Sequence, residues 1–326
     1  MANIYRGGMQ ISGNSGGGSN IDTTQLTQNI VSGVEAILRP TGHQYPNVNL
    51  YPVQVIPRFI VPSSSMTVDN LSSIYTLDNS ITQIDLSNPD HLYILENLDA
   101  SRFQNISYIF KNVKSSPGVV VDLSEWDTSN VKEARLLFKG LTSSGGYTTS
   151  GSYTTSVGTF NLSDWDVRNI SDMSLMLASW QDTSSSSMVY FDSLILDNWN
   201  VTNVTKMDFM FTNVRVAELD LSTWNMSYVP SFFHMFDSYT SSGYPPILEK
   251  LLWGGAVNAI DPDGSNPALD LTKTIITPAN ANLFFQSLGT KTSSGTTTIK
   301  MPTTAQGADL SIAEAKGYTI TNITQP

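Results

Sequence analysis

The sequence predicts an α/β solenoid, in which short parallel strands and short helices of a repeated unit stack along the chain. Three observations predict it: an apolar phrase occurs five times between Tyr93 and Phe236, its internal spacing never changes, and all length variation falls between copies. This pattern is typical of supersecondary units that stack on their neighbours while loops absorb insertions. The copies are Leu95/Leu98/Phe103/Phe110, Leu123/Trp126/Val131/Phe138, Leu162/Trp165/Ile170/Leu177, Leu196/Trp199/Val204/Phe211 and Leu221/Trp224/Val229/Phe236.

Each copy contains a predicted short strand. Val121 and Leu123 flank the polar Asp122, which is the period-two pattern of a strand with one buried face. Because such a strand cannot bury its face alone, we expect successive strands to pair in a parallel ladder. The repeated tryptophans should then stack in a column along the spine of the array, at Trp126, Trp165, Trp199 and Trp224.

A short helix is predicted after each strand. From the position five after the tryptophan, apolar residues follow the spacing i, i+3, i+6, i+7 and i+10, which forms a stripe on one side of a helix. Asn130 and Glu133 are placed to form a capping box at the start of one such helix. Each unit is therefore predicted to be a strand, a tight turn and a short helix.

The ends of the array are predicted to differ from its middle, as capping units do. Residues 68–75 and the strand-like Ile84-Asp85-Leu86 resemble a degenerate first unit. After a strand at 269–271, Thr277-Pro278 should open a helix that Gly289 stops. A strand from Thr297 to Met301, a helix near 311–316 and the segment Gly317-Tyr318-Thr319-Ile320 complete the predicted cap.

Inserts rich in Gly, Ser, Thr and Tyr separate several copies, as at 143–157 and 183–187. Such segments bury little and should be loops that project from one side. Tyrosine and serine are typical of adaptable binding loops, and the alternative is tolerated insertions with no ligand. The candidate ligand contacts are Tyr147, Tyr153, Tyr190 and Tyr239.

Three regions follow from composition: residues 1–20, 21–62 and 63–326. The first is a Gly, Ser and Asn-rich flexible arm, and the last is the repeat array with its C-terminal cap. Residues 21–62 are predicted to be an attachment segment, in which a short helix precedes an extended stretch punctuated by proline. The helix could form a bundle between chains, dock on a larger body or pack on the first unit. Its narrow apolar stripe is Leu26, Ile30, Val34 and Ile37.

Composition excludes several functional classes. The formal charge of −11, with no basic stripe, argues against nucleic acid and anionic membranes as partners. The chain has no cysteine, which removes disulfides, thiolate chemistry and cysteine-bound metals. No apolar run approaches the roughly 20 residues of a membrane-spanning helix. The N-terminus lacks a hydrophobic signal core, so we expect no entry into the Sec pathway.

Patterns that could carry chemistry are better explained as structure. The Gly-Asn-Ser-Gly-Gly sequence at 13–17 matches the G-x-S-x-G motif of the hydrolase nucleophile elbow. A flexible tail is favoured instead, because no buried strand and helix bracket the motif. Residues 261–266 resemble a calcium loop but carry the glycine at the wrong position, which favours a turn. The scattered histidines lack paired acids nearby, which favours structural roles. These histidines are His43, His91 and His234.

Acids and asparagines recur within the copies. The acids could line a strip for cations or basic partners, or could simply be solvated. The glycosylation-like Asn-x-Ser/Thr sequences arise because the repeat itself contains that pattern. The acids are Asp122, Asp127, Asp166 and Asp220, and the asparagines are Asn105, Asn161, Asn169, Asn203 and Asn225.

Two phrases resemble the BspA-type leucine-rich repeats: Leu-Ser-Glu-Trp-Asp-Thr-Ser-Asn-Val at 123–131 and Asn-Val-Thr-Lys-Met-Asp-Phe-Met-Phe at 203–211. Residues 313–320 are similar to the terminal unit common in such arrays. The resemblance implies a leucine-rich-repeat solenoid and a role in surface adhesion or recognition, in bacteria or in the viruses that infect them. It carries over no catalytic residue.

We therefore hypothesise a non-enzymatic virion protein of a bacteriophage, a head or tail fibre that needs no cofactor. The N-terminal segment would join capsid or tail proteins as a homotrimer, and the array would bind a host surface glycan or protein through many weak contacts. One alternative is a bacterial cell-surface adhesin. Another is a glycan-cleaving spike that uses paired carboxylates.

Overall fold

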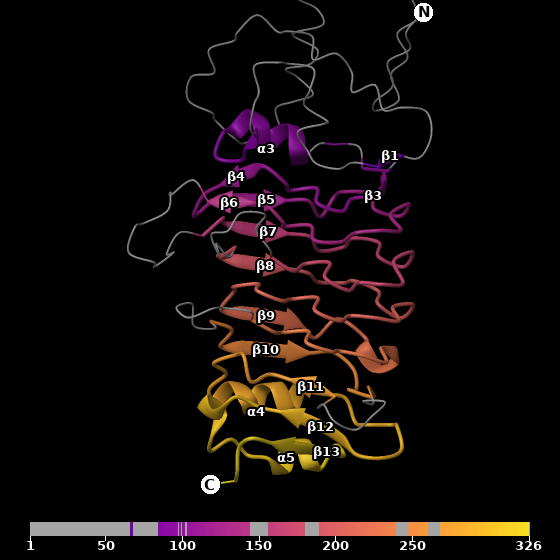
Figure 1. The fold of residues 1–326 in the computed structure, drawn as a ribbon, viewed down its shortest axis with the longest axis vertical. Helices are drawn as coiled ribbons and strands as arrows, with labels where there is room; N and C mark the ends of the chain where they lie inside the picture. Colours follow the sequence, from indigo (N-terminus) through magenta and orange to yellow (C-terminus); the bar gives the residue numbers. More distant parts are fainter. Residues whose placement is uncertain are drawn as a thin grey trace, which may run out of the picture. The chain divides into compact units, whose positions relative to one another are not determined.

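The computed structural model has a mixed α/β fold with short parallel strands and few helices (Figure 1). It describes residues 66–67, 84–96, 98, 100–101, 103–143, 156–179, 189–238, 247–259 and 268–325. Among these residues, no helix is long and apolar enough to cross a bilayer. The strands are β1 Met66–Thr67, β2 Ile84–Asp85, β3 Phe103–Asn105, β4 Val113–Ser115, β5 Val120–Asp122, β6 Thr142–Ser143, β7 Thr159–Asn161, β8 Ser193–Ile195, β9 Glu218–Leu221, β10 Lys250–Trp253, β11 Leu269–Asp270, β12 Thr297–Lys300 and β13 Tyr318–Thr321; the helices are α3 Pro89–Glu96, α4 Pro278–Ser287 and α5 Ser311–Glu314, with 3-10 turns at Met226–Tyr228 and Thr303–Ala305.

The predicted short parallel strands are confirmed. Strands β5, β7 and β8 come from successive copies, here called units two, three and four, and they pair in parallel with Val121 opposite Phe160 and Phe160 opposite Leu194. These three side chains are buried, while their strand neighbours face outward or lie part-buried, as the alternation predicts. Strands β9 and β10 pair in the same way, and Figure 1 shows β7 to β10 one above another.

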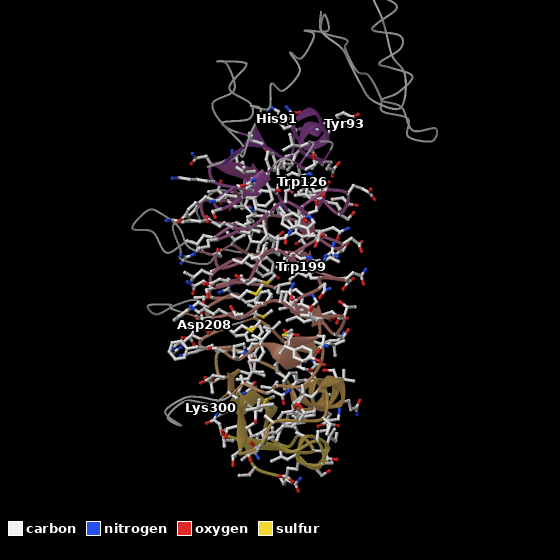
Figure 2. The ribbon with its side chains drawn as sticks, turned by 90° about the vertical axis from the view of Figure 1, so that its right-hand side faces the viewer. His91, Tyr93, Trp126, Trp199, Asp208 and Lys300 are labelled. Carbon is white, nitrogen blue, oxygen red and sulfur yellow. The ribbon has the colours of Figure 1, made fainter. Side chains whose placement is uncertain are left out.

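The four repeated tryptophans lie on one another. Neighbouring indole rings are stacked at centroid separations of 5.9, 6.0 and 5.2 Å, with interplanar angles of 3°, 6° and 8°. Each indole N–H donates to a backbone carbonyl of the preceding unit, as from Trp165 to Leu123 at 2.8 Å and from Trp199 to Leu162 at 2.7 Å. The indoles are at most 3% exposed, and Figure 2 shows Trp126 above Trp199 in the stack. Burial and a satisfied N–H together make this column the spine of the array.

The short helix predicted after each strand is wrong. Residues 131–141 and their counterparts form no helix but contain turns closed by a backbone hydrogen bond across three residues, as from Lys139 N to Leu136 O at 3.0 Å and from Leu141 N to Phe138 O at 3.1 Å. A chain of such turns brings every third or fourth side chain inward, which reproduces the spacing of a helical stripe. The residues of the stripe in unit two are buried as expected: Val131, Ala134, Leu137, Phe138 and Leu141.

The predicted capping box is wrong for the same reason. With no helix to cap, the Asn130 amide donates to the carbonyl of Ser101 at 2.6 Å, in the preceding unit. The Glu133 carboxylate accepts a hydrogen bond at 2.7 Å from the side chain of Asn105, also in the preceding unit. Both side chains therefore join neighbouring units instead of closing a helix end.

The turn segments form a second set of bonds between units. Phe110 N donates to Leu137 O at 3.1 Å, and Phe211 N donates to Met235 O at 2.9 Å. In a helix these N–H groups would bond within their own segment, whereas here each bonds to the next unit. The phenyl rings follow the backbone, since Phe110 stacks on Phe138 at 5.4 Å. The array is thus held by a strand ladder and by a turn ladder.

Unit one departs from the others on its strand side. Leu95 lies in helix α3 instead of a strand, and the Glu96 carboxylate at the end of α3 accepts the Asp122 N–H of strand β5 at 3.0 Å. Burial raises the pKa of Glu96, and the hydrogen bond from Asp122 N–H opposes that rise. A side chain therefore takes the place of the strand carbonyl that would otherwise continue the ladder. The proposed degenerate unit at 68–75 lies outside the described residues.

The aromatic residue after unit five has a different place from the tryptophan column. Trp253 is the last residue of β10 and pairs with Leu221, so it holds the place of a strand leucine, and Ala256 follows where a column tryptophan would stand. It is fully buried, with its ring edge-on to Phe232 at 5.0 Å and to Phe284 at 6.4 Å. Trp253 thus connects the last unit to helix α4 of the cap.

The C-terminal cap follows the sequence closely. Thr277 caps α4 by accepting the Asn280 N–H, and strands β11, β12 and β13 pair in parallel. Helix α5 ends at Glu314, two residues earlier than expected. The Lys316 amine donates to the Gln286 and Leu288 carbonyls at the end of α4, and burial lowers the pKa of this lysine.

Replacing Tyr318 with phenylalanine should destabilise the cap by about 1–3 kcal/mol, because it removes a hydroxyl that joins two segments. The buried hydroxyl accepts the Val257 N–H at 3.0 Å and donates to the Gly289 carbonyl at 2.7 Å. Urea denaturation of the variant measures the loss. The matched control is Tyr228→Phe, because Tyr228 is 68% exposed and its hydroxyl should contribute little. Equal midpoints for the two variants would contradict the assignment.

Candidate interaction surface

The four acids of the predicted acidic strip all cap turns. In the sequence pattern Asp/Asn-x-Ser/Thr, the first side chain accepts the N–H two residues later, as from Ser124 to Asp122 at 3.1 Å and from Ser222 to Asp220 at 2.9 Å. This is the Asx turn, which stabilises a tight bend locally. Asp127 caps a turn after its tryptophan in the same way. The proposed acidic strip is therefore two sets of turn caps, one at strand ends and one after the tryptophans.

The glycosylation-like sequences have the same structural cause. The Asn225 side chain accepts the Ser227 N–H at 3.3 Å, and the Asn161 side chain accepts the Ser163 N–H at 3.1 Å. Asn169 uses its amide to donate to the Ser129 carbonyl of the preceding unit at 2.6 Å. The serine or threonine two residues on is thus part of a turn.

Carboxylates of successive units affect one another beside the tryptophan column. Burial raises the pKa of Asp197, and the negative charges of Asp220 and Asp164 raise it further. The Asn198 amide donates to Asp164 at 2.9 Å. In contrast, the Arg168 guanidinium lowers the pKa of Asp166, which it contacts at 2.7 Å. Within the described ranges, no group of three or more His, Cys, Asp or Glu side chains is arranged to hold a metal ion.

The structure does not bring the predicted single residues together. The His91 ring lies against the backbone of Asp85, and His234 contacts the Asp237 carboxylate at 2.5 Å in unit five. Tyr190 is part-buried, and its backbone bridges to Arg215. The other candidate contacts lie outside the described residues, as do the attachment helix and the third histidine: Tyr147, Tyr153, Tyr239, Leu26, Ile30, Val34, Ile37 and His43.

One surface feature of the turn segments was not predicted. Five large residues, each five positions after the first apolar residue of its turn segment, have left-handed backbone conformations, with φ between 51° and 61°. All except Leu136 occupy the third place of a turn such as that closed by the bond from Met210 N to Met207 O. We call them the left-handed stripe: Tyr108, Leu136, Leu175, Phe209 and His234.

The residue types in the left-handed stripe are unusual for that conformation. Glycine and asparagine are the ordinary choices for the third place of such a turn. Units one, two and four follow that preference four residues later, at Asn112, Gly140 and Asn213. A bulky side chain in the left-handed region costs roughly 1–2 kcal/mol. The repeat keeps a large side chain at this one place in all five units, which indicates that the side chain itself is needed.

The left-handed stripe is continuous and partly exposed. Leu136 N donates to Leu175 O at 3.0 Å, Leu175 N to Asp208 O at 3.0 Å, and Phe209 N to Phe233 O at 2.9 Å, so neighbouring members lie on adjacent layers. The Phe209 ring is 5.1 Å from that of His234 and 5.5 Å from that of Phe233, which is 42% exposed. At the other end, the Lys139 amine lies 5.5 Å from the centre of the Tyr108 ring.

The repeats also define the family. No curated protein and no solved structure matches this sequence. The profile of a family described as "Mycoplasma protein of unknown function, DUF285" matches residues 69–156 and 152–244, which together make up more than half of the chain. The matched segments include all five units. The chain therefore belongs to the DUF285 family of BspA-like repeat proteins.

Proposed function

We propose that this protein is a non-enzymatic recognition protein whose units build a BspA-type leucine-rich-repeat solenoid. The solenoid is the rigid part that contacts a host surface glycan or protein. The N-terminal segment fastens the protein, as a homotrimer, to the capsid or tail of a phage particle. In this role the protein is a head or tail fibre.

The observation that carries the proposal is the use of polar side chains within the array. Asp122, Asp127 and Asp220 cap turns, and Asn130 and Asn169 bond to the preceding unit. Glycan cleavage needs two facing carboxyl groups, one of them in a setting that keeps it protonated. Carboxylates already held by local N–H groups fit a scaffold better than an acid–base pair. A surface of repeated contacts favours binding summed over copies.

The change of composition at the N-terminus supports the attachment role. Residues 1–20 are rich in Gly, Ser and Asn, and residues 21–62 combine a narrow apolar stripe with a proline-punctuated stretch. These regions lack the repeated phrase, so a separate task suits them. A second candidate function is a bacterial cell-surface adhesin, which the naming of the family after a bacterium favours. Both functions use the array for recognition and differ in what carries it.

Removing residues 1–62 should leave a folded array that no longer joins particles. Mass spectrometry of purified particles and immunogold labelling with antibodies to the array measure incorporation of the full chain and of the deletion. Gold label on virions that carry the full chain, but not on virions made with the deletion, supports the fibre function. Gold label on the cell envelope supports the adhesin function. Normal incorporation of the deletion contradicts the attachment role. New reducing ends released from host polysaccharide would contradict a non-enzymatic function.

A further inference from the structure

The charged residues beside the left-handed stripe have opposite signs on the two sides of its centre. Leu175, in unit three, is the middle member. In unit two, Glu133 and Arg135 stand two and four residues after the first apolar residue of the turn segment. In unit four, Lys206 and Asp208 stand at the same two places, so each place carries the opposite charge in the two units. All four side chains lie exposed or part-buried on the turn side of the array.

The ends of the left-handed stripe repeat this arrangement. Lys111 in unit one and Asp237 in unit five occupy the same place, three residues after the stripe member of each unit, again with opposite charge. Asp172 of unit three lies at the centre. Although burial raises the pKa of Asp172, hydrogen bonds from Ser174 and the positive charges of Lys206 and Arg135 lower it overall. Three pairs of places therefore carry opposite charges at equal distances from the midpoint, namely Glu133/Lys206, Arg135/Asp208 and Lys111/Asp237, whereas Lys132 and Lys139 stand opposite the neutral Thr205 and Thr212.

We propose that the left-handed stripe is the contact surface for a second copy of this chain, docked face to face and antiparallel. A two-fold axis lying across the stripe at Leu175 brings each place in one unit opposite the same place in another. Arg135 then faces Asp208 of the second copy, and Glu133 faces Lys206 of the second copy. Symmetry makes every such contact twice, as in an isologous interface.

The members of the left-handed stripe match under the same operation. Leu136 faces Phe209, Leu175 meets itself, and Tyr108 faces His234, so each large side chain covers another. A parallel arrangement would put unit two against unit two and unit four against unit four, with Arg135 near its own copy and Asp208 near its own copy. Like charges across an interface disfavour that alternative. In the antiparallel arrangement only Asp172 meets its own copy, and its charge is offset by the nearby Lys206 and Arg135 of the same chain. A foreign partner whose charge had one sign would be attracted by some of these side chains and repelled by others, since the charges on the two sides of Leu175 are opposite.

The contact surface is small, so the pairing should be weak. Five partly exposed side chains on each copy form an interface at the low end of the size range, below about 1,200 Å² in total. Weak pairing gains strength when many copies are displayed together. In an antiparallel pair the chains enter their arrays at opposite ends, which suits copies fixed to two facing surfaces. This inference goes beyond the proposed function, because it holds whether particles or cells carry the protein.

The absence of cysteine allows a direct test with the full chain. Leu175→Cys places one thiol per copy on the proposed axis, where oxidation should give a disulfide-linked dimer. Leu136→Cys is the matched control, because Leu136 has the same place in its unit and the same left-handed conformation. Its two copies would lie two layers apart, at a separation of roughly 10 Å, which is beyond the Cα reach of a disulfide. We expect cross-linking of the first variant at least tenfold faster than of the second.

An exchange of charges tests the register. On the Leu175→Cys background, Glu133→Lys alone or Lys206→Glu alone sets like charges opposite each other twice, and cross-linking should slow by roughly fivefold. The two changes together restore opposite charges and should restore the rate. Because salt screens the attraction between opposite charges, raising the salt concentration should slow the cross-linking of Leu175→Cys itself and affect the single charge variants less.

Three outcomes would overturn the inference. The first is equal cross-linking of Leu175→Cys and Leu136→Cys, and the second is no cross-linking of either variant at protein concentrations up to about 100 μM. The third is a double charge exchange that cross-links as slowly as the single exchanges. Loss of binding to host cells in Phe233→Ala, with no Leu175→Cys dimer, would also overturn it and assign the left-handed stripe to a foreign ligand. Failure of the proposed function shows separately, as missing label on both particles and cells.

Discussion

Replacing Trp165 with alanine should lower the free energy of unfolding by about 3–5 kcal/mol, the largest loss expected from any one side chain of the array. Trp165 is 1% exposed and stacks on both Trp126 and Trp199. The change leaves a cavity between two rings and removes the N–H that satisfies the Leu123 carbonyl. Guanidinium denaturation, followed by far-UV circular dichroism, measures the loss.

Two controls separate the contributions to that loss. Trp165→Phe keeps an aromatic ring in the column but removes the N–H, so a loss of about 1–3 kcal/mol is expected. Tyr228→Ala tests a large but exposed side chain and should change stability by less than about 0.5 kcal/mol. If Trp165→Ala were no more damaging than Tyr228→Ala, the tryptophan column would not be the spine of the array.

Replacing Gly254 with alanine should separate β10 from unit five and cost more than about 3 kcal/mol, because the added carbon has no room. A Cβ at this position would lie 1.9 Å from the Trp224 carbonyl oxygen and 2.7 Å from the Leu221 and Ser222 carbonyl oxygens. These neighbours are backbone atoms of one turn, in which the Leu221 carbonyl accepts the Trp224 N–H at 3.0 Å, so they cannot move away singly. Thermal unfolding, with tryptophan fluorescence as the signal, measures the effect.

The control for Gly254→Ala is Gly118→Ala. Gly118 has a φ of +76°, yet a Cβ there would meet nothing within 4 Å. Its replacement therefore reports the conformational cost alone, about 1–2 kcal/mol. A loss at Gly254 as small as that at Gly118 would mean that the two layers can shift apart freely, against the close approach seen here.

The sequence predicted the buried residues of the array better than its secondary structure. The alternation around Asp122 correctly gave a short strand, and the spacing from Val131 to Leu141 correctly gave a buried face. The same spacing was assigned to a helix because turns that advance three residues and a helix of 3.6 residues per turn both return a side chain to one face every three or four positions. Only the partners of the N–H groups distinguish them, and several of those partners, such as Leu137 O for Phe110 N, lie in the next unit.

The left-handed stripe could not be predicted once those residues were assigned to a helix. In a helix Leu175 would be one more residue on the solvent side, with nothing to distinguish it from its neighbours. Its significance depends on a positive φ, and neither leucine nor phenylalanine signals that conformation in sequence. The exchange of charge between Glu133/Arg135 and Lys206/Asp208 was visible in the letters. It acquired meaning only when the turn ladder fixed which residues share a layer.

Each tryptophan of the column satisfies a backbone carbonyl of the preceding unit; the Trp199 indole N–H, for example, donates to the Leu162 carbonyl of unit three. Since the junctions from unit two to unit five use the same kinds of contact, with neighbouring indole rings 5.2–6.0 Å apart, duplication of one unit should add one layer to the array without requiring a new kind of contact. The length of the array can therefore change in evolution by the copying or deletion of whole units, while helix α3 and the C-terminal cap remain as its two ends.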